Sequence, residues 1–213
     1  YSDRNMVHLN DKFVIGIGGV ARCGKDTMAR ILSLLLQEQG FNVVIESFAS
    51  PLKYEAQEFL DSKFGIDVFT SYSRAKQGIR PFLVGLAEVH RLQTEGQFYW
   101  KALADRSLDL EPKTIILIPD LRFGYYSEDE IHFVNENGVS IHLELAKSIF
   151  AAECKSMPAN DTERFNDPIL KEKCKIRFNW YVQENPEEYY IAPIRSLLAY
   201  SIIHLIESKF KNI

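Results

Sequence analysis

The sequence is short of cysteine, of long apolar runs and of excess charge of one sign, and each shortage excludes a class of protein. Three cysteines in 213 residues are too few and too widely spaced for a disulfide framework or a zinc site, which indicates reduced thiols. No apolar run reaches the roughly 20 residues that cross a bilayer. A net charge of −4 argues against a broad nucleic-acid surface or an anionic membrane face. We therefore expect a cytoplasmic protein with neither a membrane nor a nucleic-acid polymer as partner.

The chain also lacks internal repeats and low-complexity segments. Its 213 residues, 46% of them hydrophobic, are enough for one sizeable core and short for two. We expect a single domain over residues 1–213. A homodimer is among the assemblies that the sequence allows.

The clearest motif is a glycine-rich loop between an apolar run and an amphipathic run. Phe13–Ile17 predicts a strand, and the helical spacing of apolar residues resumes after Thr27. The spacing G-x-x-x-x-G-K is that of a loop whose backbone N–H groups surround phosphates while its lysine reaches the outer ones. The expected loop consists of Gly19, Val20, Ala21, Arg22, Cys23, Gly24, Lys25, Asp26 and Thr27.

Asp26 stands where such loops usually have a hydroxyl residue, and Thr27 supplies the hydroxyl one position later. A carboxylate beside phosphates needs a cation between them. We therefore interpret Asp26 as a Mg²⁺ ligand, direct or through water, and Thr27 as a phosphate contact. The alternative is that Asp26 is only a first-turn acid, which the helix dipole favours.

A second motif overlaps the first. Gly16, Gly18 and Ala21 fit the dinucleotide-binding pattern G-x-G-x-x-A, and Glu46 closes the next apolar run. That pattern leaves Gly24 and Lys25 unexplained, so we favour the phosphate-binding loop.

The remaining pattern predicts a largely parallel sheet with a helical insertion. Further strands are expected over residues 41–45, 114–118, 139–145 and 175–182, and a closing amphipathic helix over 194–205. Residues 47–112 carry helical runs ending near residue 63, over 81–92 and over 98–108, with a polar stretch over 70–78 between them. An insertion at this point lies over the carboxyl ends of the strands, where acceptors bind in α/β proteins.

Several side chains of the insertion are candidate substrate ligands. Arg80 is favoured among the cations, because Pro81 predicts a helix start at which the guanidinium and N–H groups converge on an anion. Trp100 either stacks on a base or packs in the core. The cations considered for a second phosphate are Lys53, Arg74, Lys76, Arg80 and Arg91.

The strand over 114–118 runs into Pro119 and Asp120, with Arg122 two residues further on. A carboxylate at the tip of a buried strand can hold Mg²⁺ through water or orient an acceptor oxygen, and Arg122 can bind the phosphate that is attacked. The alternative is a strand-end turn with an ion pair. The polar stretch over 146–168 predicts a mobile lid loop.

These motifs together resemble the deoxynucleoside monophosphate kinases of bacteriophages, a branch of the P-loop nucleoside monophosphate kinases. The resemblance rests on the loop over 22–27, the segment over 48–53, Arg80, Trp100, the segment over 119–123 and the acids over 161–163. It implies a three-layer α/β/α P-loop kinase fold with a five-stranded parallel sheet. It also implies γ-phosphoryl transfer from ATP, with Mg²⁺, to a small-molecule nucleotide. Lys25, Asp120 and Arg122 would be catalytic, Asp26 and Asp120 would hold the metal, and the acceptor would contact Lys53, Arg80, Trp100, Arg122 and Glu128.

The chain departs from that branch at Val84–Leu86 and at Tyr126, where the branch carries a glutamine with a Gly-Thr pair and a glutamate. Glu128 lies two residues late for that glutamate. These departures keep two alternatives open: a kinase for a phosphorylated metabolite that is not a nucleotide, and an inactive nucleotide-binding module.

Overall fold

The computed structural model describes residues 8–70, 72–146, 157–181 and 186–211. In these ranges a five-stranded sheet has the order β2-β3-β1-β4-β5, and each neighbouring pair is parallel. The strands are β1 (Lys12–Gly18), β2 (Asn42–Ile45), β3 (Thr114–Leu121), β4 (Gly138–Ala146) and β5 (Ile176–Tyr181). The helices are α1 (Lys25–Glu38), α2 (Ser50–Phe64), α3 (Ser73–Thr94), α4 (Gln97–Ser107), α5 (Glu130–Asn137), α6 (Asp161–Lys173), α7 (Pro186–Leu197) and α8 (Ile203–Lys211), with a π-helical turn, η1 (Leu198–Ile202), between the last two.

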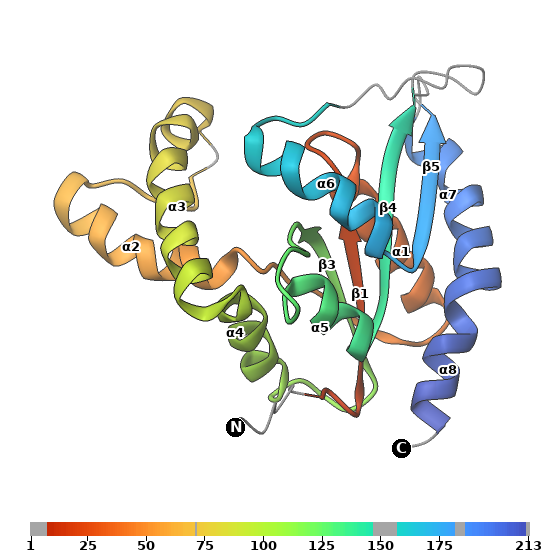
Figure 1. Ribbon diagram of the computed structural model, residues 1–213. Coiled ribbons are helices and arrows are strands. Elements are labelled where there is room, and N and C mark those ends of the chain that lie inside the picture. Colours follow the sequence, from red (N-terminus) through yellow and green to blue (C-terminus); the bar gives the residue numbers. More distant parts are fainter. Residues whose placement is uncertain (1–7, 71, 147–156, 182–185, 212–213) are drawn as a thin grey trace.

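The two faces of the sheet pack against different helices, which makes three layers (Figure 1). Side chains alternate along a strand, so Ile15 faces one layer while its neighbour Val14 faces the other. Ile15 belongs to a core shared with α1, α7 and α8, and Val14 belongs to a core shared with α4 and α5. The α/β class, the five parallel strands and the closing helical run that the sequence predicts are confirmed.

The strand order excludes the dinucleotide-binding interpretation. In that fold the strand after the first helix lies next to the first strand. Here β3 lies between β1 and β2. The Glu46 carboxylate, which would have held a ribose, instead pairs with Arg106 at 3.3 Å.

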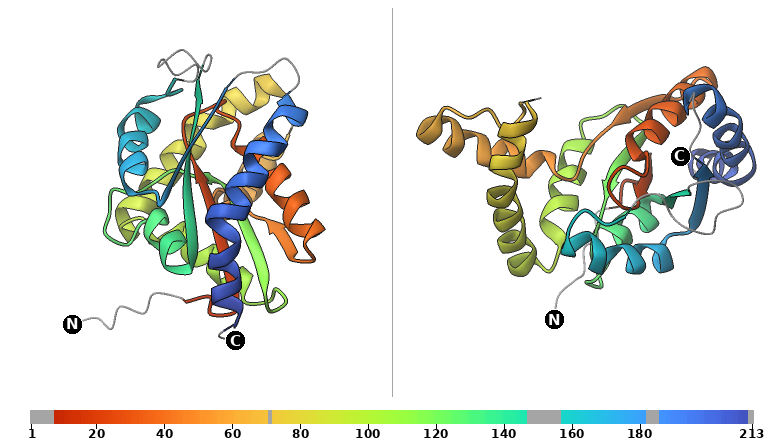
Figure 2. Two further views of the ribbon diagram at one scale, coloured as in Figure 1. Left: turned by 90° about the vertical axis from the view of Figure 1, so that its right-hand side faces the viewer. Right: turned by 90° about the horizontal axis from the view of Figure 1, so that it is seen from above.

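The insertion between β2 and β3 forms α2, α3 and α4. Of these, α4 packs on the sheet layer through Trp100 and Leu103, whereas α2 and α3 project from it as an arm in two perpendicular views (Figures 1 and 2). The inner side of this arm has a small core of its own, which includes Ala56, Leu60 and Ile79.

Two helix boundaries differ from the sequence prediction. Helix α3 begins at Ser73, so the polar stretch over 73–78 is helical and Arg80 lies inside the helix, not at its start. Helix α6 occupies 161–173, which includes the second half of the expected lid loop. Its start is stabilised because the Asn160 side chain accepts from the Glu163 N–H at 2.9 Å, as an N-cap does. Of the remainder of that loop, residues 147–156 lie outside the described residues.

The sequence pattern also predicts that the strand over 41–45 is buried and that the strand over 139–145 has one less covered face, and both predictions are wrong. Strand β2 is an edge strand whose last residue, Ile45, is 51% exposed. Strand β4 is interior, and Val139–Leu143 are all buried, so neither of its faces is open. Within the described ranges, no helix has the length and hydropathy of a membrane span.

Candidate active site

The glycine-rich loop follows β1 and ends at the first residue of α1. Gly19 has a φ of 135° and Gly24 a φ of 97°, a region that residues with a Cβ rarely adopt. A Cβ on Gly24 would overlap the Trp180 ring, and one on Gly19 would overlap the Leu143 carbonyl oxygen. Trp180 also donates from Nε1 to the Cys23 carbonyl oxygen at 2.8 Å. The glycines are therefore required by close packing of the loop on β4 and β5.

The loop's polar groups are bonded within the protein. Lys25 Nζ donates to the carbonyl oxygens of Gly19, at 2.8 Å, and Val20, at 2.7 Å. The backbone N–H of Ala21 donates to Glu163 Oε2 at 3.0 Å, and the same oxygen accepts from Ala159 at 2.9 Å. A carboxylate therefore lies on a loop amide, where this class of loop binds a phosphate oxygen. An anion fits this position.

Cys23 is fully buried within the loop. Burial raises the pKa of its thiol to about 11, and the nearby Lys25 charge only partly opposes this. The thiol is neutral at physiological pH, and it acts as a small packing group.

Asp120 lies at the carboxyl end of β3, the strand beside β1. Its Oδ2 accepts from Ser47 Oγ at 2.6 Å and from Ala49 N at 3.0 Å, and its Oδ1 accepts from Phe48 N at 3.0 Å. These bonds fix the carboxylate between β3 and the start of α2. A carboxylate oxygen has two acceptor positions, so Oδ1 keeps capacity for a further ligand.

A cavity of about 990 Å³ extends from this edge of the sheet between α3 and α6. Gly19 and Val20 of the loop share its wall with Asp120. The cavity wall also includes three of the predicted acceptor ligands, Lys53, Arg80 and Arg122. Three cations and the Asp120 carboxylate, from α2, α3 and the end of β3, therefore line the cavity beside the loop, an arrangement suited to a second phosphate.

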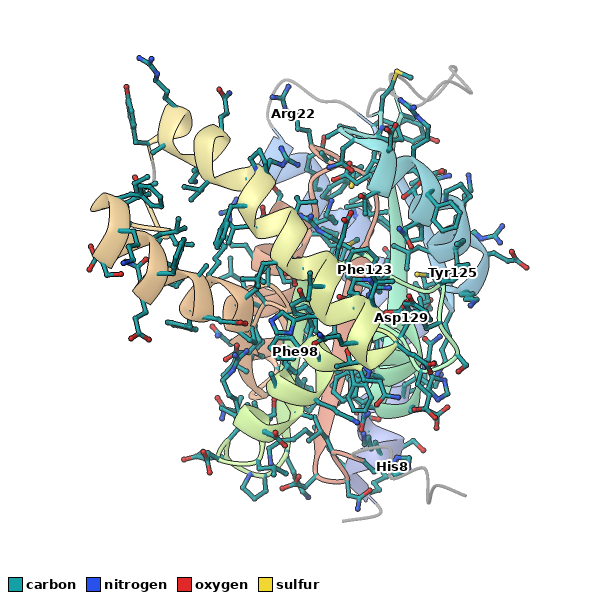
Figure 3. All side chains as sticks on the ribbon, turned by 60° about the vertical axis from the view of Figure 1, so that its left-hand side comes forward. His8, Arg22, Phe98, Phe123, Tyr125 and Asp129 are labelled. Atoms are coloured by element: carbon teal, nitrogen blue, oxygen red, sulfur yellow. The ribbon has the colours of Figure 1, made fainter. Side chains whose placement is uncertain are left out.

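Arg91, which also lines the cavity, is already paired. Its two terminal nitrogens each donate to Asp129 at 2.8 Å, and its guanidinium lies 3.6 Å from the Phe123 ring centroid. Figure 3 shows Phe123 and Asp129 beside α3. The Asp129 carboxylate takes two of the five N–H donors of Arg91 and offsets its charge, so Arg91 is less suited to grip a phosphate than the other cations of the wall. Arg74 is not part of the cavity wall.

Two predicted acceptor contacts are also not part of the wall. Trp100 is 1% exposed, stacks on Phe133 and donates to the backbone oxygen of Glu128 at 2.8 Å, so its ring belongs to the core. The Glu128 carboxylate accepts from Gln97. Of the acids at the start of α5, it is Glu130, the first residue of that helix, that lines the cavity.

The predicted metal ligands differ in placement. Asp26 is exposed in the first turn of α1, and Asp120 lines the cavity. Among the described residues no group of three or more histidine, cysteine or acidic side chains could hold a metal on its own. Mg²⁺ usually binds through one or two carboxylates together with substrate phosphates and water. The residues present fit that mode of binding.

Several residues of the site were not predicted. Trp180 and Ser47, which hold the loop and Asp120, follow no motif that marks them. Glu163 has a local signal, because Asn160 and Glu163 have the spacing of a helix capping box. That spacing would have predicted the start of α6.

The site is thus a glycine-rich loop, a strand-end carboxylate and a cavity lined by both cations and acids, at the carboxyl edge of a parallel sheet. No protein-family model matches the sequence, and no curated protein does.

Among the solved structures with a similar fold are the following kinases. Thymidylate kinase from Ehrlichia chaffeensis is 13% identical, with 88% of this chain and 98% of that chain covered and a TM-score of 0.38. Dephospho-CoA kinase from Campylobacter jejuni is 12% identical, with 88% and 97% covered and a TM-score of 0.42. Shikimate kinase from Bacteroides thetaiotaomicron is 13% identical, with 88% and 98% covered and a TM-score of 0.40. Similarity at this level carries no argument about the substrate of this chain.

Proposed function

We propose that this protein transfers the γ-phosphoryl group of ATP to a (deoxy)nucleoside monophosphate, giving the diphosphate. The observation that carries the proposal is the shared cavity wall of Gly19, Val20, Asp120 and Arg122. Donor phosphates on the loop and an acceptor phosphate at the strand end would then be adjacent.

On the donor side, the loop N–H groups and Lys25 hold the β- and γ-phosphates. Lys25 Nζ exchanges its bonds to the Gly19 and Val20 carbonyls for phosphate oxygens, and the Ala21 amide exchanges Glu163 for the same ligand. The positive end of α1 points at the same anion. Thr27 and Asp26 follow in the first turn of that helix.

On the acceptor side, Lys53, Arg80 and Arg122 neutralise the monophosphate. One of its oxygens attacks the γ-phosphorus, the bond from that phosphorus to the β-γ bridging oxygen breaks, and ADP leaves. The attacking oxygen is already anionic, so the reaction needs positioning and charge neutralisation more than a general base. Mg²⁺, held with Asp120 and Asp26, would neutralise charge on the donor phosphates.

The test is a coupled assay with ATP, Mg²⁺ and each common ribo- and deoxyribonucleoside monophosphate. We expect Lys25→Ala to lower kcat/KM by about three orders of magnitude or more, because the lysine contacts the transferred group. Lys63→Ala, at the exposed end of α2, is the matched control and should retain wild-type rates.

The cation-lined wall would also suit a phosphorylated metabolite that is not a nucleotide, so such acceptors belong in the same panel. Turnover only of these would replace the proposed substrate class. ATP binding without transfer to any acceptor would indicate an inactive nucleotide-binding module.

A further inference from the structure

The innermost part of the cavity wall contains a buried hydroxyl without a partner. Tyr99, on α4, is 3% exposed and lines the cavity. Its hydroxyl oxygen is buried and has no hydrogen-bond partner among the described residues. Buried polar groups in folded proteins are nearly always hydrogen-bonded. A hydroxyl of this kind in a cavity wall is placed to bond a ligand.

A buried carboxyl group lines the same cavity. Glu130 is 2% exposed, and its Oε2 accepts from the backbone N–H groups of Arg122, at 2.9 Å, and Phe123, at 3.2 Å. In the part of the chain that the structure describes, the hydrogen bonds of the Glu130 carboxyl group involve only Oε2. Glu130 and Tyr99 line the same cavity from α5 and α4, two helices that pack against each other, so one ligand in the cavity can reach both groups.

The protonation of Glu130 makes it a donor. The pKa of its carboxyl group is raised to about 8, first by burial and then by the charges of Asp129, the N-cap of its helix, and of Asp120, on β3. The Arg122 backbone N–H and the Arg91 guanidinium on α3 oppose this only in part. With Oε2 occupied as an acceptor, the proton on the other oxygen is available to a ligand.

Aromatic side chains also line the cavity. Phe123 and Tyr126 line the cavity beside Glu130, and Tyr125 approaches Phe165 of α6 with ring centroids 5.7 Å apart. Flat apolar walls around a few convergent polar groups are typical of sites for a flat heterocyclic ligand.

We propose that Tyr99 and Glu130 form a polar subsite that hydrogen-bonds the edge of the acceptor's heterocyclic base. This inference rests on the proposed function and extends it. The subsite selects nucleotides over sugar phosphates, and Tyr99 and Glu130 are the residues that make the selection. The Glu130 carboxyl donates to a ring nitrogen or carbonyl, and the Tyr99 hydroxyl bonds the neighbouring group on the same edge.

The test is calorimetric titration of the full chain with dAMP, dCMP, dGMP, dTMP and ribose 5-phosphate, which carries no base. Tyr99→Phe removes only the hydroxyl. Tyr200→Phe removes a hydroxyl that is 85% exposed in η1 and is the matched control. For the tightest-binding nucleotide we expect Tyr99→Phe to raise Kd about tenfold or more, and Tyr200→Phe to leave it unchanged. Glu130→Gln should change the order of preference among the four bases.

Equal affinity of wild type and Tyr99→Phe for all four nucleotides would overturn the subsite, as would binding of ribose 5-phosphate as tight as that of any nucleotide. A thermal midpoint of Tyr99→Phe equal to or above that of wild type shows that the variant folds. ATP binding is titrated separately, so loss of the subsite with ATP binding and transfer intact leaves the proposed function standing. Absence of phosphoryl transfer with the selective binding intact would overturn only the proposed function.

Discussion

At the scale of single residues, alanine substitutions at two glycines with positive φ distinguish the cost of backbone strain from the cost of steric overlap. Gly24 has a φ of 97° and a Cβ there would overlap the Trp180 ring, whereas Gly40 has a φ of 86° and a Cβ there would meet nothing within 4 Å. Both substitutions to alanine incur the strain of about 1 kcal/mol or more. We expect Gly24→Ala to lower the unfolding free energy by more than Gly40→Ala and also to weaken ATP binding. Chemical denaturation and calorimetry measure both effects, and equal losses would contradict the proposed packing.

Glu130 predicts a pH dependence of stability. Its pKa is raised to about 8 in the fold, above the ordinary value of 4.5, so between these pH values the folded state holds a proton that the unfolded state has lost. The carboxyl group therefore makes stability fall as pH rises through that range, by at most about 1.4 kcal/mol per pH unit. Glu130→Gln keeps the acceptor oxygen and removes the titration. In denaturant melts, the unfolding free energy of Glu130→Gln minus that of wild type should therefore be larger at pH 8 than at pH 5. A difference that does not depend on pH would contradict the raised pKa.

The two tryptophans show what sequence can and cannot predict at this scale. Trp100 matched a family position and was weighed as a base contact, and it lies in the core against Phe133. Trp180 matched nothing, and it closes the phosphate-binding loop through Cys23. Both outcomes depend on contacts between residues far apart in sequence, about which local spacing carries no information.

At the scale of elements, α6 connects the loop to the cavity. Glu163 in its first turn bonds Ala21 of the loop, and the same helix contributes Phe165 and Asp167 to the cavity wall. Under the proposed function, nucleotide phosphates displace this carboxylate from the amide. Removing its charge should therefore strengthen ATP binding, by several-fold in Glu163→Gln, because a weaker competitor remains.

Glu172→Gln, at the exposed far end of the same helix, is the control and should leave ATP affinity unchanged. Weaker ATP binding by Glu163→Gln would contradict the competition and would assign Glu163 to the bound state instead.

The strands were easier to predict than the helices. Apolar runs such as Thr114–Ile118 are buried on both faces, so their composition alone marks them. Helix α3 was predicted too short, because its first turns are polar and Pro81 indicates a start. The chain tolerates Pro81 within that helix, in an arm that projects from the sheet (Figure 2).

At the scale of the whole molecule, the cavity lies between the arm and α6, which contribute Leu52 and Leu170 to the same core. The arm supplies Lys76 and Arg80 on one side, and α6 supplies Asp161 and Glu163 on the other. Substrates that bond both sides should draw them together and exclude water, as in transferases with a closing step. We expect the radius of gyration in solution X-ray scattering to fall when a nucleotide monophosphate and a non-hydrolysable ATP analogue are added together. An unchanged radius with both ligands bound would show that the arm and α6 are already in place.

The pairing of β1 with β3 has one more consequence. The loop and Asp120 come from segments about a hundred positions apart, and they meet because Gly16 pairs with Ile118 in the central ladder. A slip of one residue would turn Asp120 to the opposite side of the sheet. The proposed nucleotide site therefore forms only when this ladder is complete. On this proposal, a chain in which folding stops before β1 pairs with β3 would not bind ATP, even if its glycine-rich turn had already formed.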